Sequence, residues 1–204
     1  RTLRALFRVT LRRDGGAQSS RGALVVARPD RLRLQLFSLG FITVFDYTAS
    51  ADRYCLRRPL EAEARVGRFP EGDGDALAWD LRPLFLRGEI ERARVTGGDD
   101  DVWTAIVEER TGERILRISR RDSTIESESF LVEGRAKFRA RYSDYRPVDG
   151  VPLPFRIEID DPVHETTIAI DVERYARNDA VESSVFEICR GGTIGRSDEA
   201  QKSH

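Results

Sequence analysis

One histidine set among carboxylates is the strongest candidate for chemistry in this chain. His164 lies within residues 160–165, whose sequence is DDPVHE. An imidazole beside carboxylates can ligate a divalent metal ion. A short polar segment with a proline, placed between two apolar runs, is also typical of a hairpin loop. We favour the loop and predict no metal site there.

Other catalytic signatures are missing from the sequence. Residues 97–101 (GGDDD) lack the alternating acidic positions of a calcium loop and predict a solvated turn. The chain contains no Gly-x-Ser-x-Gly nucleophile elbow, no phosphate-binding loop and no dinucleotide-binding glycine motif in a strand-to-helix context. The sequence therefore predicts a protein that is not an enzyme and that uses no cofactor.

The two cysteines, Cys55 and Cys189, are the remaining reactive side chains. An even number of cysteines in an exported protein permits a disulfide, and their spacing does not suit metal ligands. We expect two separate buried thiols in preference to a disulfide.

The composition indicates a folded domain with a well-solvated surface. The 204 residues are 40% hydrophobic and 34% charged, with a formal net charge of −1. Balanced, interleaved charge argues against a nucleic-acid partner, and no apolar stretch approaches the ~20 residues that span a bilayer. The chain begins at Arg1 and contains no methionine, so we expect that an upstream segment has been removed.

The elements that would position any site are mostly β-strands. Apolar and polar residues alternate with a period of two, the pattern of half-buried antiparallel strands. The expected strands are residues 6–12, 23–28, 31–36, 41–47, 54–56, 103–108, 115–120, 124–132, 137–145, 155–160, 166–175 and 185–188. Short turns between them predict an antiparallel meander that curls on itself.

A helical stripe interrupts this pattern at residues 75–87. Its apolar positions at i, i+4, i+7 and i+8 are Leu77, Leu81, Leu84 and Phe85. We predict one domain over residues 1–190 and a disordered polar tail over residues 191–204.

The alternating strands give the curved sheet one apolar face. Its main members are Leu32, Leu34, Leu36, Phe138, Ala140, Tyr142, Phe155, Ile157, Ile159, Ile168, Ile170 and Val172. One short helix is too small to cover so many strands. The pattern leaves two alternatives open: a cavity for an apolar guest, or a core that further sequence upstream of Arg1 closes.

Three stretches together resemble the LolA/LolB-like superfamily, the lipoprotein carriers and receptors of the bacterial envelope. They are residues 21–34 (RGALVVARPDRLRL) followed by 38–40 (SLG), residues 145–157 (YRPVDGVPLPFRI), and the closing residues 185–188 (VFEI). The resemblance spans roughly residues 3–188. It implies a mainly β fold with a few helices, in which a curved antiparallel sheet forms an unclosed half-barrel under a helical lid.

The resemblance also implies a function, which is to bind acyl chains of lipids or lipoproteins in an apolar cavity and to act in their transfer to the outer membrane. The cavity residues would be Leu32, Leu34, Leu36, Phe138, Tyr142, Phe155, Ile157, Ile168 and Ile170. The stripe from Leu77 to Phe85 would be the lid, and Leu39 and Phe41 would contact a membrane surface.

On this basis we expect a monomer in the periplasm, either free or held to the outer membrane through a lipidated cysteine upstream of Arg1. The sequence leaves open whether the protein is a soluble carrier or an anchored receptor.

Two other classes of protein stay open beside the lipid or lipoprotein carrier. An envelope structural or sensing module would use the same fold to bind a protein partner, for example along an edge strand. A hydrolase would need a convergent polar cluster, which the sequence does not offer.

Overall fold

The structure is a computed structural model that describes residues 1–38, 42–61, 63–68, 93–109 and 112–189. Strands account for most of this part of the chain, as predicted. They are β1 (Thr2–Arg13), β2 (Gly16–Ala27), β3 (Arg31–Phe37), β4 (Thr43–Ser50), β5 (Arg53–Arg58), β6 (Glu63–Arg68), β7 (Arg94–Gly98), β8 (Val102–Glu109), β9 (Gly112–Ser119), β10 (Ile125–Val132), β11 (Arg135–Val148), β12 (Val151–Asp161) and β13 (Thr166–Arg177).

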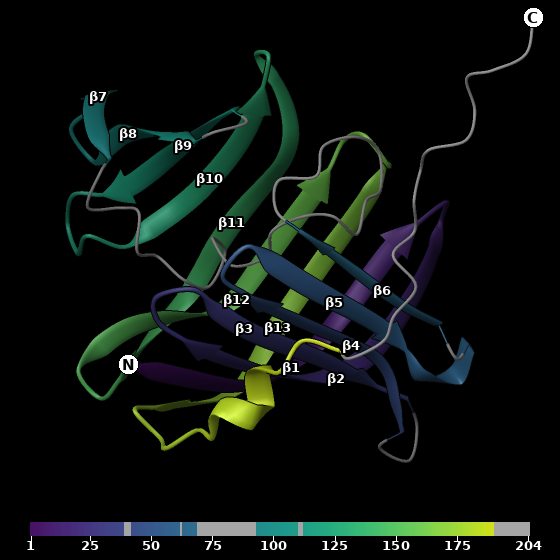
Figure 1. Ribbon diagram of the computed structural model, residues 1–204. Helices are drawn as coiled ribbons and strands as arrows, with labels where there is room; N and C mark the ends of the chain where they lie inside the picture. The colour runs from purple at the N-terminus through teal and green to yellow at the C-terminus, as the bar shows by residue number, and fades with distance from the viewer. Residues whose placement is uncertain (39–41, 62, 69–92, 110–111, 190–204) are drawn as a thin grey trace, which may run out of the picture.

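All of these strands form a single antiparallel sheet (Figure 1). Strands that are consecutive in sequence pair with each other throughout the sheet, except β6 and β7. The one long-range pairing joins the two ends of the meander, because β1 lies between β2 and β13. The hairpin between β1 and β2 turns through Asp14 and Gly15, whose φ angles of 51° and 75° suit a two-residue turn. The described sheet is unclosed, with β6 and β7 at its two edges.

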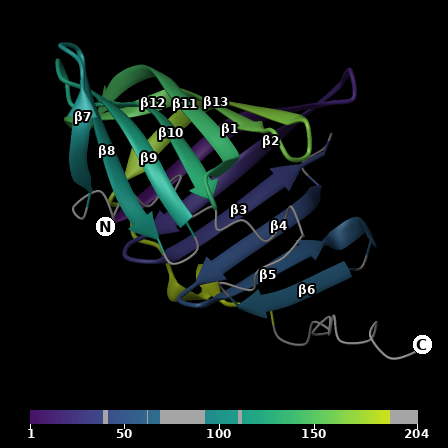
Figure 2. The same cartoon turned by 90° about the horizontal axis from the view of Figure 1, so that it is seen from above.

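The sheet is strongly curved, so that β3–β6 and β8–β11 lie on opposite sides of a concave face (Figure 2). One packed cluster joins both halves: Tyr47 of β4 and Leu56 of β5 belong to it together with Ile125 of β10 and Ala140 of β11. Strands so distant in the sheet share a cluster only because the sheet curls around it. We call the concave side, which carries this cluster, the inner face. The convex side is the outer face.

Several sequence-based predictions need correction. Residues 185–188 do not form a strand; the 3-10 helix η3 (Ser183–Phe186) occupies this region and packs on the outer face of β3 and β4. The strands β6 and β7 were not predicted. The predicted helical lid over residues 75–87 and the predicted disordered tail over 191–204 lie outside the described residues. Within the described residues the helical elements are η3 and η1 (Pro59–Glu61), both single 3-10 turns.

Candidate functional site: the apolar inner face

The inner face brings together all nine residues predicted to line a cavity. On β3, the register places Leu32, Leu34 and Leu36 opposite Ala49, Tyr47 and Phe45 of β4. In the other half of the sheet, on the same face, Tyr142 of β11 stands opposite Ile157 of β12, which stands opposite Ile170 of β13. The apolar cluster contains Leu32, Leu34, Leu36, Phe138, Tyr142, Phe155, Ile157, Ile168 and Ile170. Period-two alternation in antiparallel register accounts for this convergence.

On β3 and β4, burial of the inner-face residues decreases from one end of the strands to the other, whereas on β12 Phe155 is partly buried and Ile157 and Ile159 are buried. At the end where β2 turns into β3, here called the closed end, Leu32 is fully buried (0% exposed). Toward the end that carries the β1–β2, β3–β4 and β12–β13 hairpins, Leu36, Phe45 and Ile168 are only partly buried. We call this the hairpin end. At its rim, Leu11 is 37% exposed. The apolar surface therefore runs without interruption from a packed core to solvent.

The structure adds inner-face residues that the sequence had not singled out. Phe7 and Val9 of β1, Leu24 and Val26 of β2 and Tyr47 of β4 belong to the same cluster. The Phe7 ring lies over Gly22 of β2, where an added Cβ would clash with the Phe7 Cζ. The alternation in residues 6–12 could have predicted Phe7 and Val9, because the odd-numbered positions of this strand face inward.

A buried ion pair lies on the inner face of β9 and β10. Arg114 Nη1 is 3.6 Å from Glu128 Oε2, and their side chains are 8% and 4% exposed. In the sheet register Glu128 stands opposite Ala140 and Leu116, whereas Arg114 stands opposite Phe130 and Val107. Buried charges are tolerated when they are paired. The two opposite charges of this pair balance each other among the apolar side chains of the inner face. The sequence analysis did not predict this pair.

The His164 cluster forms the β12–β13 hairpin turn, as the favoured prediction had it. Asp161 Oδ1 accepts hydrogen bonds from the backbone N–H groups of Val163 and His164. Its Oδ2 lies 2.6 Å from His164 Nδ1. The Asp161 side chain thus closes the turn. Among the described residues, no group of three or more His, Cys, Asp or Glu side chains is arranged to hold a metal ion.

The other predicted site residues cannot be placed. The lid residues Leu77, Leu81, Leu84 and Phe85 and the membrane-contacting residues Leu39 and Phe41 lie outside the described residues. Ile42, the residue before β4, is 55% exposed at the hairpin end. In the part of the chain that is described, no helix is long and apolar enough to cross a membrane.

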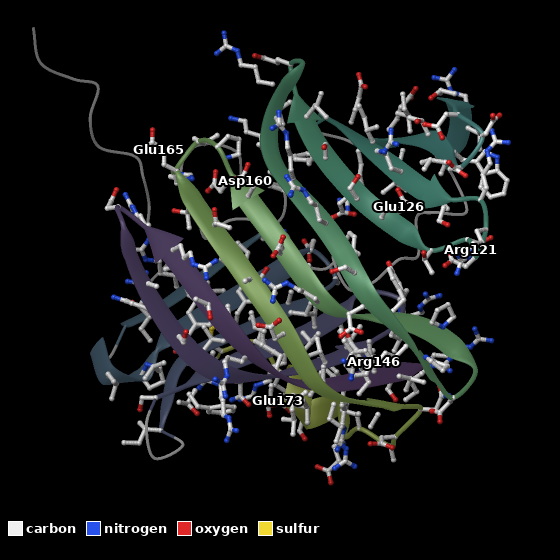
Figure 3. The ribbon with its side chains drawn as sticks, turned by 180° about the vertical axis from the view of Figure 1, so that it is seen from behind. Arg121, Glu126, Arg146, Asp160, Glu165 and Glu173 are labelled. Atoms are coloured by element: carbon white, nitrogen blue, oxygen red, sulfur yellow. A yellow bond between two sulfur atoms is a disulfide. The ribbon has the colours of Figure 1, made fainter. Side chains whose placement is uncertain are left out.

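The outer face is polar over most of its area. Figure 3 views it from behind and shows labelled charged residues such as Asp160 on β12 and Glu173 on β13. Ion pairs lie along it both between and within strands: Arg156 of β12 lies 2.6 Å from Asp171 of β13 and 2.7 Å from Glu158 of its own strand. The outer face is a solvated surface except where the C-terminal segment covers it.

That C-terminal segment, residues 178–189, is here called the strap. It begins beside β1, where the carbonyl oxygen of Asp179 accepts a hydrogen bond from Thr2 Oγ1. It then crosses the outer face to β3, where the Phe186 ring is buried with the Arg31 guanidinium 5.1 Å from its centroid. It ends at β5, where Cys189 forms a disulfide with Cys55.

The disulfide corrects our expectation of two separate thiols. Cys55 and Cys189 are 134 residues apart in sequence, but their Cα atoms are 5.8 Å apart because the strap returns across the sheet. Cys55 is indeed buried, at 1% exposed. The prediction failed because the sequence did not reveal the path of the strap.

A buried carboxylate lies beneath the strap. Asp46 of β4 accepts two hydrogen bonds from Arg33, at 3.0 and 2.8 Å, and one from Arg57 at 3.2 Å. Arg33 also donates to the backbone carbonyl of Val185 in the strap at 3.3 Å. The hydrogen bonds to Asp46 raise the pKa of Arg33 above its ordinary value. Arg33 therefore links the wall of the half-barrel to the strap.

Comparison with known structures identifies the class of fold. A putative outer membrane lipoprotein-sorting protein domain from Vibrio parahaemolyticus shares 12% identity with a TM-score of 0.67, covering 91% of this chain and 88% of that one. A LolA superfamily protein from Nitrosomonas europaea gives the same identity and TM-score, covering 91% and 90%. A DUF1329 family protein from Desulfovibrio piger has a TM-score of 0.71 at 11% identity, covering 91% and 89%.

These similarities confirm the resemblance at the level of the fold: the chain has the fold of LolA superfamily and lipoprotein-sorting structures. No family model and no curated protein matches the chain. At 11–12% identity the similarity concerns the fold alone.

Proposed function

We propose that this protein is a non-enzymatic binding protein of the bacterial envelope that holds acyl chains of lipids or lipoproteins against its inner face. In this role it would act in their transfer to the outer membrane. The observation that carries the proposal is an apolar inner face that is packed at its centre and only partly buried toward the hairpin end on β3, β4 and β13. Leu32 provides a packed floor, whereas Leu36, Phe45 and Ile168 present partly exposed apolar surface near the hairpin end.

The energetics of such a site are sufficient for tight binding. Each buried methylene group contributes about 0.8 kcal/mol, so a chain of about ten carbons offers about 8 kcal/mol before the costs of ordering it. An apolar face makes few directional demands, so it would accept chains of different length. Release would then depend on movement of the walls.

Binding is favoured over catalysis by the chemistry of the inner face. Its charged residues Arg114 and Glu128 form an ion pair with each other. His164 and Asp161 are engaged in a hairpin turn. The fold similarity and the disulfide both favour the periplasm, because disulfides persist in oxidising compartments. The lipoprotein-sorting name of the Vibrio structure agrees with this proposal.

The test is direct measurement of bound lipid and of probe uptake. We expect native mass spectrometry of protein from a bacterial envelope fraction to show added mass, and extraction to release a fatty acid, phospholipid or acylated peptide. We also expect a dansyl-labelled fatty acid to bind and to be displaced by that lipid. A clean apo mass together with no probe uptake would refute the proposal and favour an envelope module that binds a protein partner.

Two neighbouring residues of β1 provide a matched pair of variants. Val9 lies on the inner face and Thr10 on the outer face, and both are half-buried. A carboxylate at Val9 would have to be desolvated beside an acyl chain, so V9D should weaken probe binding by at least about tenfold. T10D, which adds the same charge one residue away, should leave probe binding unchanged. Equal losses in both variants would contradict the assignment of the inner face.

A further inference from the structure

The strap lies directly behind the proposed binding face. Its anchors on the outer face alternate along the strands with inner-face residues. Cys55 lies between Tyr54 and Leu56, and these two side chains belong to the inner cluster. Successive side chains of a strand point to opposite faces of the sheet. A force that holds Cys55 therefore acts on the same strand that shapes the inner face.

The same alternation holds at β3 and β4. Arg33, which bonds to the strap, lies between the inner-face residues Leu32 and Leu34. Asp46, which binds Arg33, lies between Phe45 and Tyr47. The strap is thus fixed to three successive strands of one wall, through a side-chain clamp at β3 and β4 and through the disulfide at β5.

Without the disulfide, few described contacts hold the far end of the strap. After Phe186, the backbone hydrogen bond that the segment to Cys189 makes with described residues runs from Glu187 N to Ser184 O at 3.2 Å, within η3 itself. The disulfide is therefore the main link between this end of the strap and β5. The strap is also a surface element, and Cys189 is less buried than Cys55.

From this arrangement we propose that the strap is a redox-dependent latch: the Cys55–Cys189 disulfide holds the β3–β5 wall in its curved form, and reduction by a dithiol frees the wall and speeds release of the bound acyl chain. The effect on release rests on the proposed function. The release of the strap does not.

The chemistry is thiol–disulfide exchange with a dithiol reductant, supplied by a small molecule or by a protein. One thiolate of the reductant attacks Sγ of Cys189, because Cys55 is buried, and the Cys55 thiolate leaves and takes up a proton. The second thiol of the reductant then attacks the mixed disulfide and releases Cys189 as a thiol. The protein gains two electrons and two protons, and the reductant becomes a disulfide.

The first arm of the experiment needs no ligand. Hydrogen–deuterium exchange is measured on oxidised protein and on protein reduced with dithiothreitol and alkylated with iodoacetamide. Reduction should raise exchange in residues 178–189 and in β5, whereas β8 and β9, near the opposite edge of the sheet, serve as the internal control. Unchanged exchange in the strap would overturn the latch.

The second arm measures the dissociation rate of a dansyl-labelled fatty acid from the same two samples. Coupling between two sites commonly amounts to fivefold or more, so reduction should speed dissociation by at least about fivefold. The variant C55S/C189S should show the fast rate with and without dithiothreitol, which excludes a direct effect of the reagent.

The two arms separate the possible failures. A strap that loosens on reduction while the dissociation rate stays the same would overturn the regulatory role and leave the proposed function standing. Absence of probe binding in both redox states would overturn the proposed function and with it the effect on release. In that case the exchange data still decide whether the strap opens.

Discussion

Removal of the Cys55–Cys189 disulfide should cost the protein a large part of its conformational stability. The bond closes a loop with a sequence separation of 134 residues. In the loop-closure model such a cross-link lowers the entropy of the unfolded chain by about 17 cal/mol/K, or about 5 kcal/mol at 25 °C. Because a typical domain is stable by about 5–15 kcal/mol, this is a dominant contribution.

The assay is urea unfolding of the oxidised wild type and of C55S/C189S, followed by far-UV circular dichroism. With a slope of about 2–3 kcal/mol per molar urea, the midpoint should fall by roughly 2 M. Replacing both cysteines together prevents mispairing. Reduced and alkylated wild type controls for the effect of placing serine at the buried Cys55 position, and it should unfold near the double variant.

A loss below about 1 kcal/mol would refute this reasoning. It would mean that the unfolded chain already keeps Cys55 and Cys189 close together, or that the covalent link adds little stability to the strap. The slope distinguishes these cases, because residual structure in the unfolded state lowers it. A small loss with an unchanged slope would also weaken the latch, because a disulfide that stabilises little can hold the wall only weakly.

Three further predictions concern stability. L32A removes a fully buried side chain at the closed end of the inner face and should lower the free energy of unfolding by about 2–5 kcal/mol in urea titrations. R33A leaves the buried Asp46 with Arg57 as its one described guanidinium partner and should lower the free energy of unfolding by about 3 kcal/mol. R33K should recover only part of this stability, because an ammonium group keeps the charge but cannot make the bidentate contact. Hydrogen bonds from Thr124 above all, then from Ser119, lower the pKa of Asp122 below its ordinary value of 3.8. The ionised form is therefore favoured by folding, and the resulting stability is present above that value and lost as the pH falls through the lower folded pKa. The difference in unfolding free energy between wild type and D122N should be constant above about pH 5 and should shrink below about pH 4; a difference that does not change with pH would contradict it.

Much of the sheet could be predicted because alternation reports directly on which face of a strand is buried. The run from Arg31 to Leu36 gave both the strand β3 and the inward orientation of its leucines. The same reasoning placed residues of β11, β12 and β13 on one face. Because inward-facing residues of a curled sheet must meet, a list of alternating apolar positions was enough to predict the composition of the inner face.

The strands β6 and β7 were not predicted, and the reason is physical. Strands β6 and β7 are the edges of the sheet, have six and five residues, and contain few apolar side chains. An edge strand pairs on one side only, so its sequence carries a weak period-two signal. Strand β7 also ends in Gly97 and Gly98, which lower β-propensity.

The opposite error occurred at the C-terminus. Residues 185–188 (VFEI) alternate as a strand would, but this segment packs across β3 and β4 and pairs with no described strand. The segment instead uses Phe186 to pack on the outer face. The disulfide was missed for the same reason. Alternation fixes the face on which Cys55 lies, but it cannot reveal which distant segment crosses that face.

The graded inner face implies that stability and binding depend on different parts of one apolar surface. Side chains at the closed end, such as Leu32 and Ala49, are fully buried, so their loss leaves a cavity in the core. Side chains toward the hairpin end, such as Val9 and Ile168, are partly exposed and contribute less to folding. Truncation at the closed end should therefore lower stability more than probe affinity, and truncation at the hairpin end should do the reverse. If both sets lowered stability equally and neither changed affinity, the whole surface would act as a core, and the envelope protein-binding alternative would become the better explanation of the fold.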